Sequence, residues 1–201
     1  MATTDREPSE VTKWDPSLTE KVIGLLRPLI KGYHRAEVRG LDNVPPGGVL
    51  VVSNHSGGLF AMDVPVFATD FYEKYGYDRP VYTLGFDLIF VGPTADFFKK
   101  TGFIPANHEN ADEALRTGGV VIVFPGGDYD VYRPTMSRNT IDFGGRTGYV
   151  RAALNAGVPI VPSVSIGGQE GQVYLTRGSS VAKAARCGAI GSRNANGLHS
   201  A

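Results

Sequence analysis

The run from Gly119 to Phe124, GVVIVF, constrains the fold of this chain most strongly. Its four central residues are all β-branched, and both alternating sets of side chains are apolar. A strand that is apolar on both faces is typical of the interior of a parallel sheet, because helices cover such a sheet on each side. The sequence therefore predicts an α/β protein in which this run is a central strand.

Further apolar runs alternate with segments of helical periodicity along the chain. Strands are expected at residues 49–53, 80–84, 103–105 and 158–166, with a short candidate at 38–41, and helices at 64–75, 107–116 and 147–155. Strand–helix–strand alternation with helices of this length favours a mostly parallel or mixed central sheet covered by helices.

An amphipathic helix is expected near the N-terminus. Asp15 and Pro16 form a typical helix start, and Pro28 should kink the helix because proline removes an internal hydrogen bond. Apolar residues recur at helical spacing as Leu18, Val22, Leu25, Leu26, Leu29, Ile30 and Tyr33. The periodicity favours packing of this stripe on the core, and the alternative is a helix lying on a bilayer surface. Both hold if the core covers only part of the stripe.

The bulk composition predicts one globular domain. Of the 201 residues, 1–14 are polar and expected to be disordered, 15–177 form the α/β domain, and 178–201 form a weakly ordered tail whose composition suggests an altered or truncated C-terminus. With 20 basic and 20 acidic residues, nothing in the charge favours nucleic acid. One cysteine, no long apolar run and no apolar leader indicate a cytoplasmic protein, soluble or peripheral on the cytoplasmic face of a membrane.

Polar side chains follow three of the expected strands, at the edge where α/β sheets bind ligands. They are Asn54-His55, Asn107-His108, and Asp128-Tyr129-Asp130 with Arg133. His55 is the candidate base, and Asp63 can return to one ring nitrogen and fix the tautomer that leaves the other nitrogen basic. A lone histidine at a strand end is as often structural, so the prediction of a site rests on the shared placement of these segments.

The common signatures of covalent catalysis and nucleotide binding are absent from the sequence. It contains no G-x-S-x-G, G-x-x-x-x-G-K-[ST], G-x-G-x-x-G or H-E-x-x-H motif. The single cysteine, Cys187, lies in the weak tail and is a poor candidate nucleophile.

Four blocks of the sequence resemble the glycerolipid acyltransferase family, which includes the lysophosphatidic acid acyltransferases. In the family's order they are Asn54-His55 with Asp63, Gly102 to His108, Phe124-Pro125-Gly126-Gly127, and Val158 to Pro162, and together they cover residues 20–175. Seven residues separate His55 from Asp63 where the family usually has four, and His108 stands at a position that is normally arginine. The third block is closest to the divergent Pro-Gly-Gly branch of the family.

The resemblance implies an acyltransferase that moves a fatty acyl group from an acyl thioester to a hydroxyl of a glycerolipid or lysophospholipid. It implies that His55 is the general base and Asp63 its orienting partner, and that no protein nucleophile, metal or other cofactor is needed because the thioester carries its own leaving group. The donor would be acyl-CoA or an acyl-carrier protein, and a membrane surface is an expected partner. The implied substrate-binding residues are Gly57, Gly58, Gly102, His108, Pro125, Gly126, Gly127, Asp128 and Arg133.

Two other functions remain open from the sequence. Asp128 and Asp130 form an Asp-x-Asp after an apolar strand, a pattern that holds Mn²⁺ or Mg²⁺ in nucleotide-sugar transferases. The other alternative is an inactive module that binds lipid or acyl thioester, in which case His55 is dispensable for binding.

Overall fold

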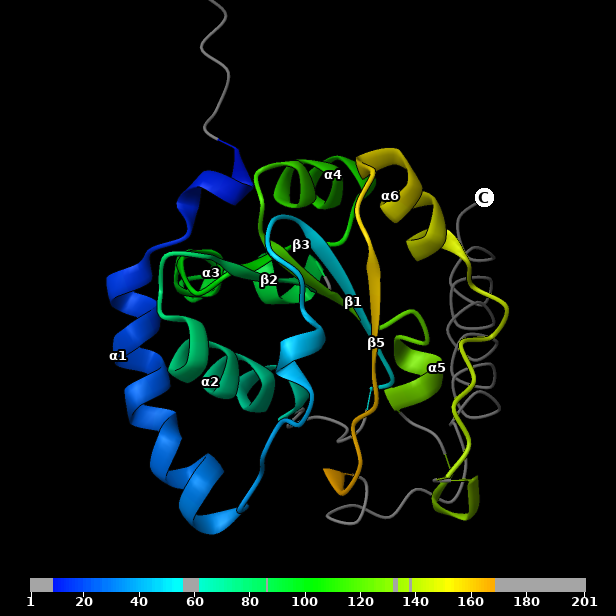
Figure 1. Ribbon diagram of the computed structural model, residues 1–201, viewed down its shortest axis with the longest axis horizontal. Helices are drawn as coiled ribbons and strands as arrows, with labels where there is room; N and C mark the ends of the chain where they lie inside the picture. The colour runs from blue at the N-terminus through cyan, green and yellow to red at the C-terminus, as the bar shows by residue number, and fades with distance from the viewer. Residues whose placement is uncertain (1–8, 56–61, 86, 132–133, 138, 169–201) are drawn as a thin grey trace, which may run out of the picture.

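A five-stranded parallel sheet forms the centre of the molecule in the computed structural model, which describes residues 9–55, 62–85, 87–131, 134–137 and 139–168. The strand order is β3-β2-β4-β1-β5 (Figure 1). The strands are β1 Val49–Ser53, β2 Val81–Gly85, β3 Phe103–Pro105, β4 Val120–Val123 and β5 Ile160–Ser163. β4 lies in the middle, so the prediction from its two apolar faces is confirmed.

The register of the sheet divides its side chains between two apolar cores. Val49 and Val51 of β1 lie beside Val120 and Ile122 of β4 and face one core. Leu50 and Val121 alternate with them and belong to the other. Because both faces of the inner strands are buried and apolar, the alternation of side chains along them does not by itself specify the register.

Helices cover the two faces of the sheet as separate layers (Figure 1). On one face α2, Asp63–Tyr75, packs Phe67 and Phe71 into the core together with Ile23 of α1, Pro16–Arg27. On the other face lie α4, His108–Arg116, and α6, Gly148–Ala156. Shorter elements connect these layers: η3 Leu41–Asn43, η5 Asp87–Phe90, α3 Ala95–Lys100, α5 Asp128–Val131 and η6 Thr135–Ser137.

The N-terminal helix changes its winding at Pro28, as its sequence predicts. α1 ends at Arg27 and a π-helix, η2 Pro28–Tyr33, continues the chain, with the His34 N–H bonded to the Leu29 carbonyl at 3.0 Å. Proline lacks an N–H and clashes with the preceding turn, which accounts for the change. The buried apolar residues of this helix are Ile30, which belongs to the predicted stripe, and Ile23, which does not.

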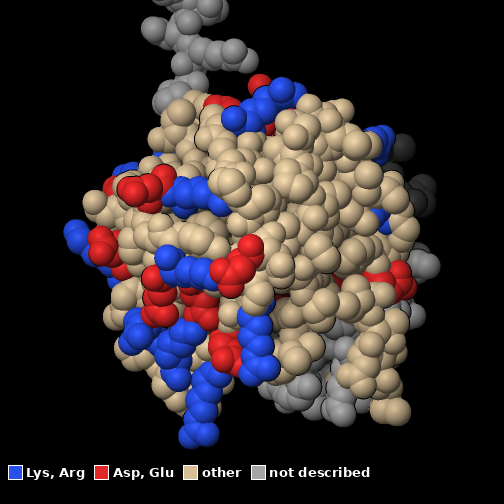
Figure 2. All heavy atoms as spheres, viewed as in Figure 1, with Lys and Arg blue, Asp and Glu red and all other residues tan. Residues whose placement is uncertain are grey.

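An outer stripe on the same helix remains exposed. Leu25 is 80% exposed, Leu29 42% and Tyr33 78%. Basic side chains interspersed with acidic ones lie around α1 and η2, at the lower left of Figure 2. No helix within the described residues is long and apolar enough to cross a bilayer. Contact of the outer stripe with a bilayer surface stays a prediction.

Part of the N-terminal segment expected to be disordered is ordered in the structure. Glu10–Lys13 form a short 3₁₀ helix, η1, that buries Val11 against the sheet. The Tyr82 hydroxyl donates to the Val11 carbonyl at 2.9 Å, and burial raises the pKa of Tyr82 to about 12, which keeps the donor protonated. One apolar residue and one buried hydroxyl therefore fix a segment whose composition is polar.

A second difference concerns residues 38–41, which form no strand. The Val38 N–H donates to the carboxylate of Asp70 on α2 at 2.6 Å instead of to a neighbouring strand, and Gly40 takes a left-handed conformation with φ +80° that starts η3. The predicted tail, 178–201, and the end of the predicted domain at 177 lie outside the described residues.

Candidate active site

His55 and Asp63 meet at the carboxyl end of the sheet. His55 follows β1 directly, and Asp63 is the first residue of α2. His55 Nδ1 lies 2.8 Å from Asp63 Oδ2, and the two side chains are 18% and 6% exposed. The partial positive charge at a helix N-terminus suits a carboxylate at this position. The longer spacing of seven residues thus still brings the imidazole and the carboxylate together.

The ring and the backbone of His55 are both held by residues that follow β4. The imidazole stacks on the Phe124 ring, with centroids 4.4 Å apart and planes inclined by 24°. The His55 N–H donates to the carboxylate of Asp130 on α5 at 2.5 Å, and Asp130 is 1% exposed. The second aspartate of the Asp-x-Asp is therefore directed at the His55 backbone rather than at solvent.

The Pro125-Gly126-Gly127 segment forms a tight turn next to this histidine. The Gly127 N–H donates to the Phe124 carbonyl at 3.0 Å and closes the turn. Arg146 donates from Nη1 to the Gly126 carbonyl at 2.8 Å and to the Pro125 carbonyl at 3.2 Å. A side chain at Gly126 would meet Asp130 Cβ at 2.3 Å, so only glycine fits there.

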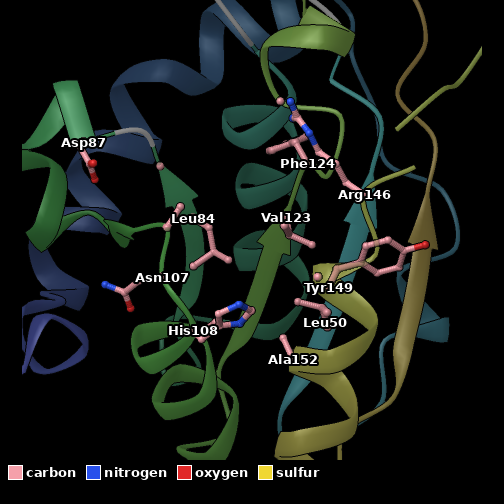
Figure 3. Close-up of a pocket in the computed structure, with 15 residues that line it drawn as sticks. Leu50, Leu84, Asp87, Asn107, His108, Val123, Phe124, Arg146, Tyr149 and Ala152 are labelled. Carbon is pink, nitrogen blue, oxygen red and sulfur yellow. The ribbon is translucent and has the colours of Figure 1, made fainter. Parts of the chain in front are cut away.

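A cavity of about 440 Å³ opens beside the turn, between the sheet and the helices α4 and α6. Apolar side chains of β1, β2 and β4, namely Leu50, Leu84 and Val123, form its floor. Phe124 and Arg146 lie at one end of it, and His108 and Ala152 at the other (Figure 3). Phe124 lines the cavity and also stacks on His55, so one aromatic ring contacts both.

The structure gathers some of the predicted site residues and separates others. His55, Asp63, Pro125, Gly126 and Gly127 lie together, and His108 and Gly127 line the cavity.

Gly102 does not lie there. It precedes β3 at the amino end of that strand, is buried near Trp14, and accepts a hydrogen bond from the Thr83 N–H of β2 at 2.8 Å. Glycine is favoured at position 102 because the backbone has a φ of +94° there. Gly57, Gly58 and Arg133 lie outside the described residues, and so does the side chain of Asp128.

Several contacts at the site have no counterpart in the sequence-based prediction. Arg146 comes from the polar loop before α6, 20 residues after its partner Gly126, and no motif marks it. Ser165, just beyond β5, donates a hydrogen bond to Asp63. Phe124 was expected only as part of a motif, and its stack on His55 was not predicted. The strand expected at 158–166 included Ser165, whereas β5 ends at Ser163, so that Ser165 follows the strand at the edge of the sheet where ligands bind.

Comparison with known proteins identifies the family. A family model described as Acyltransferase matches residues 35–166, which includes β1 to β5 and every contact of the site described above. The chain belongs to the Acyltransferase family. The sequence-based resemblance is thereby confirmed at the level of the family.

Relatives in this family include uncharacterized proteins of Mycobacterium tuberculosis and Mycobacterium bovis, each 32% identical over 166 residues, which is 81% of this chain and 46% of the relative. A mouse protein named DGAT1/2-independent enzyme synthesizing storage lipids is 27% identical over 146 residues, 69% of this chain and 41% of its own length. This chain thus spans less than half the length of these relatives. The 1-acyl-sn-glycerophosphate acyltransferase PlsC of Thermotoga maritima aligns with a TM-score of 0.45 at 19% identity, over 73% of this chain and 53% of that one.

Proposed function

We propose that this protein transfers a fatty acyl group from an acyl thioester to the hydroxyl of a glycerolipid or lysophospholipid, with His55 as the general base. The observation that carries the proposal is the pairing of His55 with the buried Asp63 at the carboxyl end of β1, beside an apolar cavity. A histidine held by a carboxylate through Nδ1 presents Nε2 as a base.

The reaction balances with the groups present. Nε2 of His55 takes the proton of the acceptor hydroxyl while the hydroxyl oxygen attacks the thioester carbonyl. The C–S bond then breaks, the ester forms, and the departing thiolate takes the proton from the imidazolium. The Asp63 carboxylate accepts from Nδ1 throughout and stabilises the imidazolium that forms between these steps.

The Gly126 N–H is the amide that we assign to the oxyanion. The Gly127 N–H already closes the turn on Phe124, whereas no group in the described part of the chain accepts from Gly126. Arg146 binds the Pro125 carbonyl, and in a planar trans peptide the N–H of Gly126 points the opposite way. An amide held in this manner stabilises negative charge on the thioester oxygen without reorganisation.

We assign the cavity to the acyl chain of the donor. Its floor is aliphatic, its volume lies within the usual range for ligand sites, and it ends at the ring that stacks on His55.

Filling the cavity tests this assignment. Replacing Ala152 of α6 by phenylalanine should lower kcat/KM for a palmitoyl thioester by about 15-fold, because two excluded methylenes cost about 1.6 kcal/mol. The same variant should process a butyryl thioester at the wild-type rate. Leu154→Phe, on the same helix at a residue that is 75% exposed, is the matched control. Equal losses for both thioesters would show that the chain of the donor does not enter this cavity.

The function itself is tested by the products. Palmitoyl-CoA is offered with lysophospholipids and, since the mouse relative is named for storage lipids, with neutral glycerolipids, all presented in vesicles. We expect CoA and acylated lipid to form in equal amounts, only when an acceptor is present, and at a rate that EDTA does not change. Co-sedimentation of the protein with the vesicles measures its contact with the membrane. Palmitoyl-CoA binding without turnover would favour the inactive module. Release of CoA without any acylated lipid would point to a thioesterase.

The metal-dependent alternative has less support in the geometry. Asp130 is buried and binds the His55 N–H, and among the described side chains no three metal-ligating groups come together. The metal-dependent alternative would be supported if the protein transferred a sugar from a nucleotide-sugar donor and EDTA abolished this transfer.

A further inference from the structure

The chain beyond β5 is fastened to the chain beyond β1 by a side chain. The backbone pairing of the two strands reaches Ser53 and Ser163. Asn54 then accepts from the Ser165 N–H through Oδ1 at 2.8 Å and donates to the Ser165 carbonyl through Nδ2 at 2.8 Å. The amide of Asn54 is buried, so these two bonds replace water that it has lost. Ser165 is thus held at a fixed place beside the histidine.

The hydroxyl of Ser165 continues this arrangement to the acidic partner of the histidine. Its Oγ donates to Asp63 Oδ1, while Asp63 Oδ2 lies 2.8 Å from His55 Nδ1. Both oxygens of a nearly buried carboxylate are therefore engaged. Rotation of the carboxylate about its Cβ–Cγ bond would break both contacts together.

We propose that Ser165 is a positioning residue, which keeps the Asp63 carboxylate aligned on His55; this inference rests on the proposed function. Ser165 touches no reacting atom in the proposed mechanism and acts through Asp63. Without its hydroxyl, Oδ1 loses a charge-assisted hydrogen bond and the carboxylate turns toward other donors. The imidazole then loses its fixed orientation, and small misalignments of a base are costly.

Steady-state kinetics gives the first test. Ser165→Ala should lower kcat by about 10- to 150-fold, the worth of one hydrogen bond to a charged group, with KM for donor and acceptor unchanged. Ser165→Thr, which keeps a hydroxyl, should restore kcat. Ser163→Ala, two residues earlier at the end of β5, is the control, because no hydrogen bond joins its side chain to His55 or Asp63 in the described part of the site.

A double variant separates positioning from general damage. If Ser165 acts through Asp63, adding Ser165→Ala to Asp63→Asn should cause no further loss of kcat. A loss in Ser163→Ala equal to that in Ser165→Ala, failure of threonine to restore kcat, or full additivity with Asp63→Asn would each overturn the proposal.

The resonance of the His55 Nδ1–H gives a reading that does not depend on turnover. In ¹⁵N-histidine-labelled protein, assigned with His55→Ala, we expect a signal protected from exchange with water that broadens in Ser165→Ala and returns in Ser165→Thr. A resonance unchanged in Ser165→Ala overturns the inference even if the enzyme is active. If the protein shows no turnover but the His55 resonance still depends on Ser165, the proposed function is refuted and the positioning role of Ser165 is retained.

Discussion

Replacing His55 by alanine should lower the acceptor-dependent turnover of palmitoyl-CoA by about 10²- to 10⁴-fold, the usual worth of a general base. Among the described residues of the site, Asp63 is engaged by the histidine and by Ser165, which leaves His55 as the base of the proposed reaction. The loss should fall on kcat, because the imidazole acts on the hydroxyl during the attack and the donor binds in the cavity beyond Phe124. Release of CoA under saturating donor and acceptor measures it.

Two controls make this result specific. His34→Ala removes an exposed histidine of the segment after η2 and should leave kcat unchanged. Thermal unfolding of His55→Ala shows whether loss of the stack on Phe124 has weakened the fold. A folded His55→Ala protein that turns over at the wild-type rate would remove the imidazole from the chemistry. Binding of palmitoyl-CoA with an equal Kd in both proteins is expected in either case.

Gly102→Ala is expected to cause a large loss of stability from a single added methyl group. Gly102 has φ +94°, where side chains are strained, and a Cβ there would lie 2.3 Å from the Val81 carbonyl oxygen at the start of β2. The strand pair β2–β3 must part to admit it. We expect the free energy of unfolding to fall by about 3 kcal/mol, and Tm by about 6–12 °C in calorimetry.

Gly118→Ala is the matched control, because it has φ +91° and open space around the added methyl group. It should cost only the backbone strain, about 1 kcal/mol. Both variants should keep the wild-type kcat and KM well below their melting temperatures. An unchanged Tm in Gly102→Ala, together with a raised KM for the acceptor, would favour the substrate-binding role that the family resemblance implies for Gly102.

The parts of the fold that sequence predicts well are those with a local cause. Asn107 caps α4 by accepting from the Asn110 N–H, and Gly157 ends α6 in a left-handed conformation, both as their residue types indicate. The two apolar faces of β4 predicted its central place.

The features that the sequence did not predict have a different physical origin. η1 is ordered because Val11 finds a place on the sheet, which composition does not reveal. Gly102 shares a motif with His108, yet β3 separates the two, so that one lies at the amino end of the strand and the other beyond its carboxyl end. Arg146 and Ser165 act through partners 20 and 102 residues away, and no periodicity along the chain encodes such pairs.

The two neighbours of β1 come from distant parts of the chain, and this determines when the site can exist. β4 begins 71 residues after β1 begins, and Asn54 finds Ser165 at a separation of 111 residues. A chain that stops before Ile160 leaves β1 as a sheet edge and Asp63 without the serine hydroxyl. During synthesis from the N-terminus, the His55–Asp63 pair therefore acquires its full support only when the last described strand has joined the sheet.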